Sequence, residues 1–245
     1  MPSQLKKEPR PFAVFDIDGT LIRWQLFHAI VHHLGKRGML PADTHEAIRN
    51  ARMVWKTRGS SDGFRTYERI LVEAYINALT SITPSLYNEI VVEVFEEYKD
   101  QVFVYTRDLM RSLKKQGYVL FAISGSQDEI VKLLAKYHGF DDAMGAQLEQ
   151  KDNAFTGIIA SPIFNKKEAL QQLVDNHNVT FNRSYAIGDS ESDVPMLKMV
   201  EFPIVFNPDK TLLAIAKKKG WNVVVERKNI AYELNYVDGT YQLSQ

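Results

Sequence analysis

Two aspartates near the N-terminus have a spacing that could support chemistry. Asp16 and Asp18 follow the apolar run 12–15 and precede Gly19 and Thr20. In an extended chain, side chains two residues apart point the same way, so the two carboxylates lie close together. Like charges at that distance require a cation or a shared proton. Glycine after the second aspartate allows the backbone to turn tightly at this point.

Further polar residues follow two later strand-like segments. Ser124 and Gly125 follow one apolar segment, and Asp189 and Asp193 follow another, with Lys166 or Lys167 opening a helical pattern just before it. The carboxyl ends of parallel strands meet at one edge of a sheet. We therefore expect carboxylates, a hydroxyl and an ammonium to converge there, although Ser124 could instead cap the helix that follows it.

This set of groups suits phosphoryl chemistry at a magnesium ion. Carboxylate oxygens with no cysteine or histidine beside them favour a hard divalent cation, with Mg²⁺ the first choice and zinc disfavoured. The cation and an ammonium can neutralise phosphoryl oxygens, and a hydroxyl can donate to them. One carboxylate can then attack phosphorus while the other handles the proton of the leaving group.

The elements that would position these groups alternate along most of the chain. Strand-like and helical segments follow one another with short connections, which is typical of a mostly parallel α/β sheet with helices on both faces. Two short strand-like pieces lie around residues 144–148 and 156–160, and residues 226–245 have no clear pattern. We expect a doubly wound, Rossmann-like core.

A long helical stretch interrupts this alternation after the first strand. We expect residues 1–22 and 105–245 to form the α/β core domain, and residues 23–104 to form an inserted, all-helical cap. Basic residues dominate 23–69, and acidic residues dominate 70–104. This asymmetry indicates either two solvated helix faces or a basic mouth that attracts an anionic substrate.

The composition disfavours or excludes several classes of protein. The 245 residues carry 30 basic and 30 acidic side chains, so the basic excess of a nucleic-acid-binding surface is missing. The absence of cysteine excludes disulfides, thiol catalysis and iron–sulfur ligation. No apolar stretch is long enough to predict a membrane helix. We expect a cytoplasmic monomer or homodimer that binds neither nucleic acid nor membrane.

The order of these motifs resembles that of a known enzyme superfamily. Residues 16–21, Ser124, Lys166 and residues 188–193 are similar to the four ordered motifs of haloacid dehalogenase (HAD) superfamily phosphatases. The helical insert after the first motif resembles the cap of the phosphoserine-phosphatase-like subgroup, subfamily IB. The resemblance covers about residues 12–225 and implies an enzyme with the α/β core described above.

The resemblance also implies a role for each residue. Asp16 would be the nucleophile that becomes an aspartyl-phosphate, Asp18 would protonate the leaving oxygen and then activate water, and Lys166 would balance their charge. Phosphate binding would fall to Thr20, Ser124, Gly125 and Lys166. The ligands and supports of Mg²⁺ would be Asp16, the backbone carbonyl of Asp18, Asp189 and Asp193.

Gln25 departs from the subgroup's pattern and leaves the substrate open. Phosphoserine phosphatases carry a glutamate nine residues after the nucleophile to hold an ammonium, and a neutral amide loses that charge-assisted bond. The implied activity is Mg²⁺-dependent hydrolysis of a small phosphorylated metabolite through an aspartyl-phosphate. The alternatives are phosphotransfer to an acceptor other than water and a non-catalytic, phosphate-binding regulator.

Overall fold

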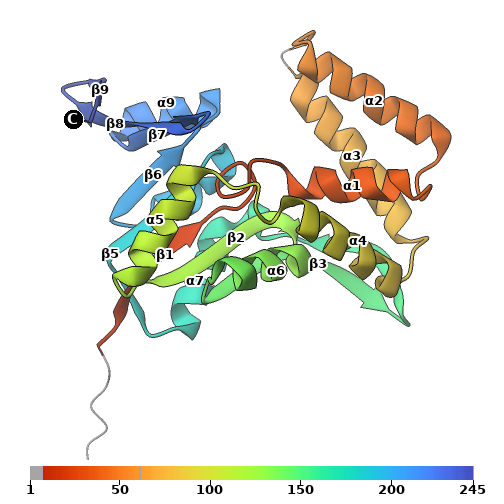
Figure 1. The fold of residues 1–245 in the computed structure, drawn as a ribbon, viewed down its shortest axis with the longest axis horizontal. Helices are drawn as coiled ribbons and strands as arrows, with labels where there is room; N and C mark the ends of the chain where they lie inside the picture. The colour runs from red at the N-terminus through yellow and green to blue at the C-terminus, as the bar shows by residue number, and fades with distance from the viewer. Residues whose placement is uncertain (1–7, 61, 245) are drawn as a thin grey trace, which may run out of the picture. The chain divides into compact units, whose positions relative to one another are not determined.

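The chain folds into two compact units (Figure 1). The computed structural model describes residues 8–60 and 62–244, so residues 1–7, 61 and 245 of the expected domains lie outside the described residues. The first unit comprises the chain through Trp24, Tyr98–Ala146 and the chain from Ser161 onwards. The second unit comprises Gln25–Glu97 and Gln147–Ala160.

A largely parallel sheet is the frame of the first unit. Over the described residues the sheet has the strand order β4-β3-β2-β1-β5-β6-β7-β8-β9, and its β4 end (Ala154–Ala160) belongs to the second unit. The strands β3, β2, β1, β5, β6 and β7 pair in parallel, and β8 and β9 are added antiparallel. The expected α/β fold class is confirmed. The strands are β1 Arg10–Phe15, β2 Val119–Gln127, β3 Asp142–Lys151, β5 Val179–Gly188, β6 Phe202–Phe206, β7 Asn222–Arg227, β8 Ile230–Val237 and β9 Thr240–Leu243.

Helices connect the strands of this sheet. Residues Phe12–Phe15 of β1 are fully buried, as an uninterrupted apolar run is when both faces of a parallel sheet are covered. On α7 the residues Ala169, Leu170 and Leu173 are buried in the same core, and this packing holds Lys166 at the start of the helix. The elements are α5 Val104–Lys115, α6 Asp128–His138, η1 Pro162–Phe164, α7 Lys166–Asn176, η2 Glu191–Asp193, α8 Val194–Leu197 and α9 Lys210–Lys219.

The second unit combines helices with a β-hairpin. The hairpin is formed by the end of β3, from residue 147, pairing antiparallel with β4 (Ala154–Ala160). The ring of Phe155 on β4 packs edge-on against Tyr87 at 5.2 Å, and the Tyr87 hydroxyl lies 3.1 Å from that of Tyr75. The helices are α1 Leu26–Lys36, α2 Ala42–Lys56, α3 Gly63–Leu79 and α4 Pro84–Tyr98.

Residues 147–160 lie in a different unit from the one that the sequence interpretation gave them. The sequence analysis placed them in the core domain as part of residues 105–245. In the structure β4 pairs with β3 at the end of the sheet and also packs on α3 and α4 through Phe155 and Gly157, whose neighbours include Ile76 and Thr80. The second unit is therefore helical over residues 25–97 and carries this hairpin in addition.

Some of the basic and acidic residues of the second unit pair with one another. Arg37 on α1 pairs with Glu93 and Glu89 on α4, and the His33 ring lies within 3.3 Å of carboxylates of Glu93 and Glu97. These pairs use basic groups from the first half of the helical stretch and acidic groups from the second. They support the interpretation of charged helix faces for these residues, as does the pair of Arg69 with Glu73 on α3 at 2.7 Å.

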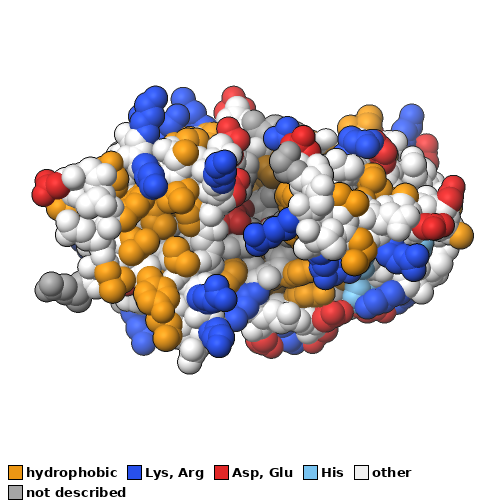
Figure 2. Space-filling view, turned by 90° about the horizontal axis from the view of Figure 1, so that it is seen from above, with side chains coloured by type: hydrophobic (Ala, Val, Ile, Leu, Met, Phe, Trp, Pro, Cys, Tyr) orange, Lys and Arg blue, Asp and Glu red, His pale blue; other side chains and the backbone are white. Residues whose placement is uncertain are grey.

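The C-terminal region, which the sequence analysis left without an assignment, forms the β8–β9 hairpin. In the space-filling view of Figure 2, hydrophobic side chains gather over the last strands of the sheet. The large exposed ones are Val225 on β7, Ile230, Tyr232 and Val237 on β8, and Leu243 on β9. Apolar residues alternate along β8 at positions 230, 232, 234 and 236, which is the pattern of a strand with one face more covered than the other.

Candidate active site

Lys166 joins two carboxylates at the carboxyl edge of the sheet. Asp16 directly follows β1, and its Oδ1 lies 2.7 Å from the Lys166 ammonium. The same ammonium lies 2.5 Å from Oδ1 of Asp193, which follows β5. Lys166 and Asp193 are at most 1% exposed and Asp16 is 5% exposed. The neighbouring Lys167 is exposed, so the structure separates the two lysines as the sequence analysis preferred.

Asp193 also holds the backbone of the loop after β5. Its Oδ2 accepts the backbone N–H groups of Asp189 and Ser190, both at 3.0 Å. Gly188 makes this contact possible, because a Cβ at that position would lie 2.5 Å or less from carboxyl atoms of Asp193. Asp193 thus has donors on both oxygens, as expected of a residue that supports a site.

Asp189 has the environment of a cation ligand. Carboxylate oxygens of Asp16, Asp189 and Asp193 lie within 4.8 Å of one another. Within the described part of the chain no hydrogen-bond donor faces the Asp189 carboxylate. Three acidic side chains with a single ammonium between them leave negative charge unbalanced, and oxygen-only donors of this kind suit Mg²⁺. The residues present therefore fit the expected metal.

The pKa shifts of these groups reflect the same excess of negative charge. Burial raises the pKa of Asp16 above its ordinary value, with Lys166 opposing and Asp193 and Asp18 adding to the rise. Burial and the charges of Asp16 and Asp193 raise the pKa of Asp189. Burial alone would lower the pKa of Lys166, but Asp16 and Asp193 outweigh it and raise that pKa. The ammonium is consequently a fixed positive charge at neutral pH.

Asp18 is held by Ser124, which lies near the carboxyl end of β2. The Ser124 hydroxyl lies 2.5 Å from Oδ2 of Asp18 and is fully buried. Ser124 Oγ also accepts the N–H of Ser126 at 2.9 Å. The N-cap of α6 is Gln127, so the structure does not support the helix-cap interpretation of Ser124. Ser124 instead orients the carboxylate expected to move protons.

Thr20 presents a buried hydroxyl at the first loop. Within the described residues its Oγ1 has no hydrogen-bond partner, although the side chain is fully buried. Its carbonyl accepts the Thr106 hydroxyl of α5 at 2.9 Å. Gly19 before it has φ +80°, and a Cβ there would lie 2.3 Å from Oδ2 of Asp189. Glycine is needed at this position both for its conformation and for the approach of Asp189.

The structure brings together most of the residues that the sequence singled out. Asp16, Lys166, Asp189 and Asp193 form one cluster, and Asp18 and Ser124 form a directly bonded pair. Gly125 follows Ser124, and a Cβ there would lie 2.9 Å from a side-chain atom of Ile163. The sequence analysis missed Thr106, since a threonine in the first turn of a helix gives no signal of its long-range partner.

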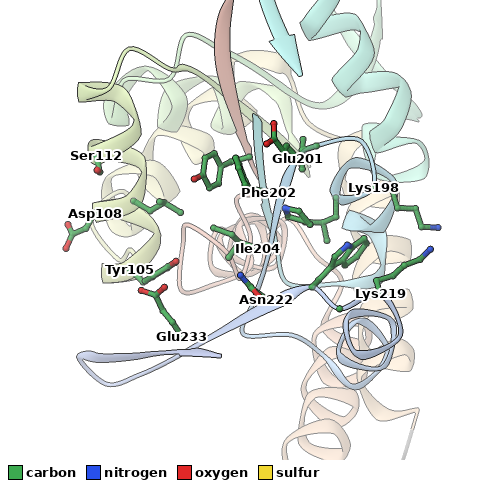
Figure 3. Close-up of a pocket in the computed structure, with 17 residues that line it drawn as sticks. Tyr105, Asp108, Ser112, Lys198, Glu201, Phe202, Ile204, Lys219, Asn222 and Glu233 are labelled. Carbon is green, nitrogen blue, oxygen red and sulfur yellow. The ribbon is translucent and has the colours of Figure 1, made fainter. Parts of the chain in front are cut away.

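A groove of the first unit lies away from these residues. A groove of about 960 Å³ is found at the amino ends of β6 and β7, and Figure 3 shows aromatic and charged side chains around it. Its walls include Tyr105, Tyr185 and Trp221, but no predicted catalytic residue lines it. The edge with the carboxylates is therefore the candidate active site.

Comparison with known proteins decides the family. The sequence profile of the haloacid dehalogenase-like hydrolases matches residues 13–198, more than half of the chain. The chain belongs to this family. The expectations of a HAD hydrolase and of an enzyme are thereby confirmed. No helix in the described residues has the length and apolarity to cross a membrane.

Relatives of the chain include proteins named as phosphatases. A histidinol-phosphatase of Neisseria meningitidis serogroup C is 27% identical over 226 residues, which cover 86% of this chain and 97% of the relative. Phosphoserine phosphatase SerB1 of Mycobacterium tuberculosis is 28% identical over 148 residues, or 59% of this chain and 46% of the relative. The chain therefore matches about half the length of SerB1 and nearly all of the first relative.

A solved structure shares the fold. A phosphoserine phosphatase captured as an analogue of its phospho-aspartyl intermediate superposes with a TM-score of 0.63 at 20% identity, covering 91% of this chain and 96% of that protein. At this identity the likeness concerns the fold.

Proposed function

We propose that this chain is a Mg²⁺-dependent phosphomonoesterase that works through an aspartyl-phosphate on Asp16. One observation carries the proposal. The buried cluster of Asp16, Lys166, Asp189 and Asp193 adjoins the Asp18–Ser124 pair, which supplies a nucleophile, charge balance and an acid/base group in one place. Its membership of a hydrolase family and relatives named as phosphatases support the same activity.

In the first step a carboxylate oxygen of Asp16 attacks phosphorus. The new bond joins that oxygen to phosphorus, and the bond between phosphorus and the ester oxygen breaks. Asp18 gives its proton to the departing oxygen, so an alcohol leaves. Lys166 holds one Asp16 oxygen at 2.7 Å, which aims the other at the substrate.

In the second step water replaces Asp16 on phosphorus. Asp18, now a carboxylate, accepts a proton from the water whose oxygen bonds to phosphorus, and the bond to Asp16 breaks. Inorganic phosphate leaves and both aspartates return to their starting state. The hydroxyl of Thr20 and the amides after Ser124 would donate to the phosphoryl oxygens.

Mg²⁺ would be held by Asp16, Asp189 and the Asp18 carbonyl, with Asp193 in support, and when bound it would neutralise charge on the phosphoryl group. Asp189 is the strongest candidate for a metal ligand, because its carboxylate has no hydrogen-bond donor among the described residues. Adding EDTA should silence the enzyme, and Mg²⁺ should restore it.

We propose a small phosphorylated metabolite as the substrate. The relative matched over nearly its whole length is named a histidinol-phosphatase, so histidinol phosphate is the first ester to test, with phosphoserine second because Gln25 replaces the expected glutamate. Residues 23–104 would act as the specificity-giving cap, including the basic residues of α2 and α3. A cytoplasmic location as a monomer or homodimer belongs to the same proposal.

The test is a phosphate-release screen with Mg²⁺ over histidinol phosphate, phosphoserine, phosphoethanolamine, phosphocholine, sugar phosphates and p-nitrophenyl phosphate. We expect turnover by the wild type and none by Asp16→Asn. Asp175→Asn is the matched control, because Asp175 lies near the opposite end of α7 from Lys166, about two and a half helical turns away. Equal turnover by wild type and Asp16→Asn would overturn the proposal, and alcohol phosphorylation in place of phosphate release would indicate the phosphotransferase.

A further inference from the structure

Glu226 is a buried carboxylate far from the catalytic motifs in sequence. It lies near the end of β7, and its side chain is 1% exposed. A buried carboxylate is costly unless donors surround it. Its backbone N–H is fixed by Oδ1 of Asn207 at 2.9 Å, so the side chain starts from a defined position.

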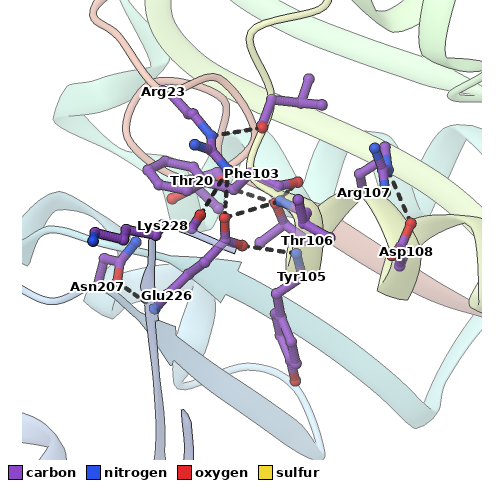
Figure 4. Close-up of polar contacts among 12 residues, drawn as sticks. Thr20, Arg23, Phe103, Tyr105, Thr106, Arg107, Asp108, Asn207, Glu226 and Lys228 are labelled. Carbon is purple, nitrogen blue, oxygen red and sulfur yellow. Dashed lines mark hydrogen bonds and ion pairs between the residues drawn. The ribbon is translucent and has the colours of Figure 1, made fainter. Parts of the chain in front are cut away.

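The donors to Glu226 come from two distant segments (Figure 4). Oε1 accepts Nη2 of Arg23 at 2.6 Å and the backbone N–H of Val104 at 3.1 Å. Oε2 accepts the backbone N–H of Tyr105 at 2.8 Å. Val104 and Tyr105 are the first residues of α5, where free N–H groups and the helix dipole favour a negative charge.

These two segments are the ones through which the chain leaves the first unit and returns to it. The second unit begins at Gln25 and the chain returns at Tyr98. Arg23 bridges the segments, since its N–H donates to the Gln101 carbonyl at 2.8 Å and its Nε donates to the Val102 carbonyl at 2.7 Å. The carboxylate of Glu226 therefore bonds both to the segment through which the chain leaves the first unit and to the segment through which it returns.

The start of α5 is in turn bonded to the catalytic loop. Thr106 follows the two amides that Glu226 accepts, and its Oγ1 donates to the Thr20 carbonyl at 2.9 Å in a fully buried position. A second bond joins the segments when the Phe103 N–H donates to the Leu21 carbonyl at 2.9 Å. A displacement at Glu226 can thus reach the loop that carries Asp16 and Asp18 through two hydrogen bonds.

We propose that Glu226 is a positioning residue for the phosphatase reaction, acting through α5 and Thr106 on the loop of Thr20. The inference rests on the proposed function for its kinetic consequence, but its structural part stands independently. The substitution Glu226→Gln keeps the shape of the side chain but replaces one acceptor oxygen with an amide N–H₂. The groups that face this side chain are all donors. At least one of the three bonds from Arg23, Val104 and Tyr105 must then be lost.

The structural readout is amide hydrogen exchange by mass spectrometry on the full chain. We expect Glu226→Gln to speed exchange in peptides covering residues 18–23 and 101–106 and to leave those of α7 unchanged. The matched control is Glu233→Gln, an exposed carboxylate on the neighbouring strand β8. Unchanged exchange in both peptides of Glu226→Gln would overturn the proposal whether or not the protein is a phosphatase.

The kinetic readout uses p-nitrophenyl phosphate with Mg²⁺. Misplacement of a catalytic loop typically costs rate, so we expect Glu226→Gln and Arg23→Gln each to lower kcat by about 10-fold with KM little changed. Because both variants break the same interaction between Arg23 and Glu226, the double variant should lose no more kcat than the worse single variant. Losses that multiply, or a wild-type kcat in folded Glu226→Gln, would contradict the positioning role.

Thr106 tests the last link without altering a charge. Thr106→Val removes the hydroxyl that donates to Thr20 while keeping the β-branched shape, and Thr106→Ser keeps the hydroxyl. We expect Val to lower kcat by about 10-fold and Ser to preserve it, with equal far-ultraviolet circular dichroism for both. Equal kcat for the two variants would overturn the proposed route. If the wild type itself releases no phosphate, the proposed function fails, and the exchange experiment still decides the positioning of the loop.

Discussion

At the residue scale, the ammonium of Lys166 bonds to both Asp16 and Asp193 in the same buried space. Its distances to them are 2.7 and 2.5 Å, and none of the three side chains is more than 7% exposed. Removing one partner from a buried ion network leaves charge uncompensated, which destabilises a protein more than the intact network stabilises it. We therefore expect Lys166 to contribute to folding as well as to the proposed catalysis.

Lys166→Met should abolish detectable turnover and lower the unfolding free energy by about 3 kcal/mol at pH 7. Urea denaturation followed by fluorescence measures the second effect. Lys167→Met, at the exposed neighbour, should change the stability by less than about 0.5 kcal/mol. A Lys166→Met protein as stable and as active as the Lys167→Met control would show that the ammonium has neither role.

Gly19 is the second residue-scale case. Its φ of +80° is in the left-handed region, and a Cβ would lie 2.3 Å from Asp189 Oδ2. Gly19→Ala should therefore displace Asp189, weaken Mg²⁺ activation by at least about 10-fold, and cost about 1 kcal/mol of stability. Titration of activity with Mg²⁺ checks this, with Gly239→Ala, in the turn between β8 and β9, as a control for the backbone cost alone. An unchanged Mg²⁺ titration would mean that Asp189 is not a ligand.

At the element scale, the helices of the second unit bury a histidine among aromatic rings. His28 on α1 is 2% exposed, with the Tyr67 ring at 5.2 Å and the Phe64 ring at 6.1 Å. Burial lowers the pKa of His28 to about 4, and repulsion from His32 and Arg52 adds to the shift. His28 and His32 are spaced i, i+4 on this helix, and the first of them, His28, is a packing residue.

This shift makes the stability of the second unit depend on pH. Because the unfolded histidine, with a pKa near 6.5, binds more protons than the folded one, stability is complete above pH 6.5 and is lost as the pH falls toward 4. At pH 5 the loss from His28 should be about 2 kcal/mol. Thermal unfolding at pH 7 and pH 5 measures it, and His28→Phe should reduce the difference between the two midpoints. An identical pH difference in His28→Phe would contradict this account.

The β3–β4 hairpin supplies another element-scale prediction. Phe155 is 4% exposed and packs on Tyr87 of α4. Phe155→Ala should destabilise the second unit by about 3 kcal/mol through the cavity it leaves. Hydrogen exchange should accelerate in α3, α4 and β4 and stay unchanged in α7, whereas the control Leu170→Ala should accelerate exchange in α7. Acceleration in α7 with Phe155→Ala would place the hairpin in the first unit.

At the scale of the whole molecule, the sequence predicted that the candidate site residues meet at one edge of the sheet, and its bounds for the two units differ from those in the structure. Asp16, Asp18 and Gly19 are neighbours, so their chemistry can be inferred from spacing, and strand order then brings Ser124, Lys166 and Asp189 to the same edge. These features depend on local pattern and on the rule that parallel strands end together.

The remaining features depend on contacts that no local pattern encodes. Residues 147–160 have the pattern of a hairpin, but its packing on α4 depends on Phe155 meeting Tyr87. Glu226 is one acidic residue near the end of a strand, and its donors lie more than 120 residues away in sequence.

The central claim is that phosphorus passes through Asp16, and one measurement tests it most directly. Asp18→Asn should still transfer phosphoryl from p-nitrophenyl phosphate, whose leaving group needs little protonation, but should release it slowly. Cold acid quench in Mg²⁺, borohydride reduction and peptide mass spectrometry should then find homoserine at position 16. Phosphate release with residue 16 unmodified, or a reduction product at another residue, would contradict the account.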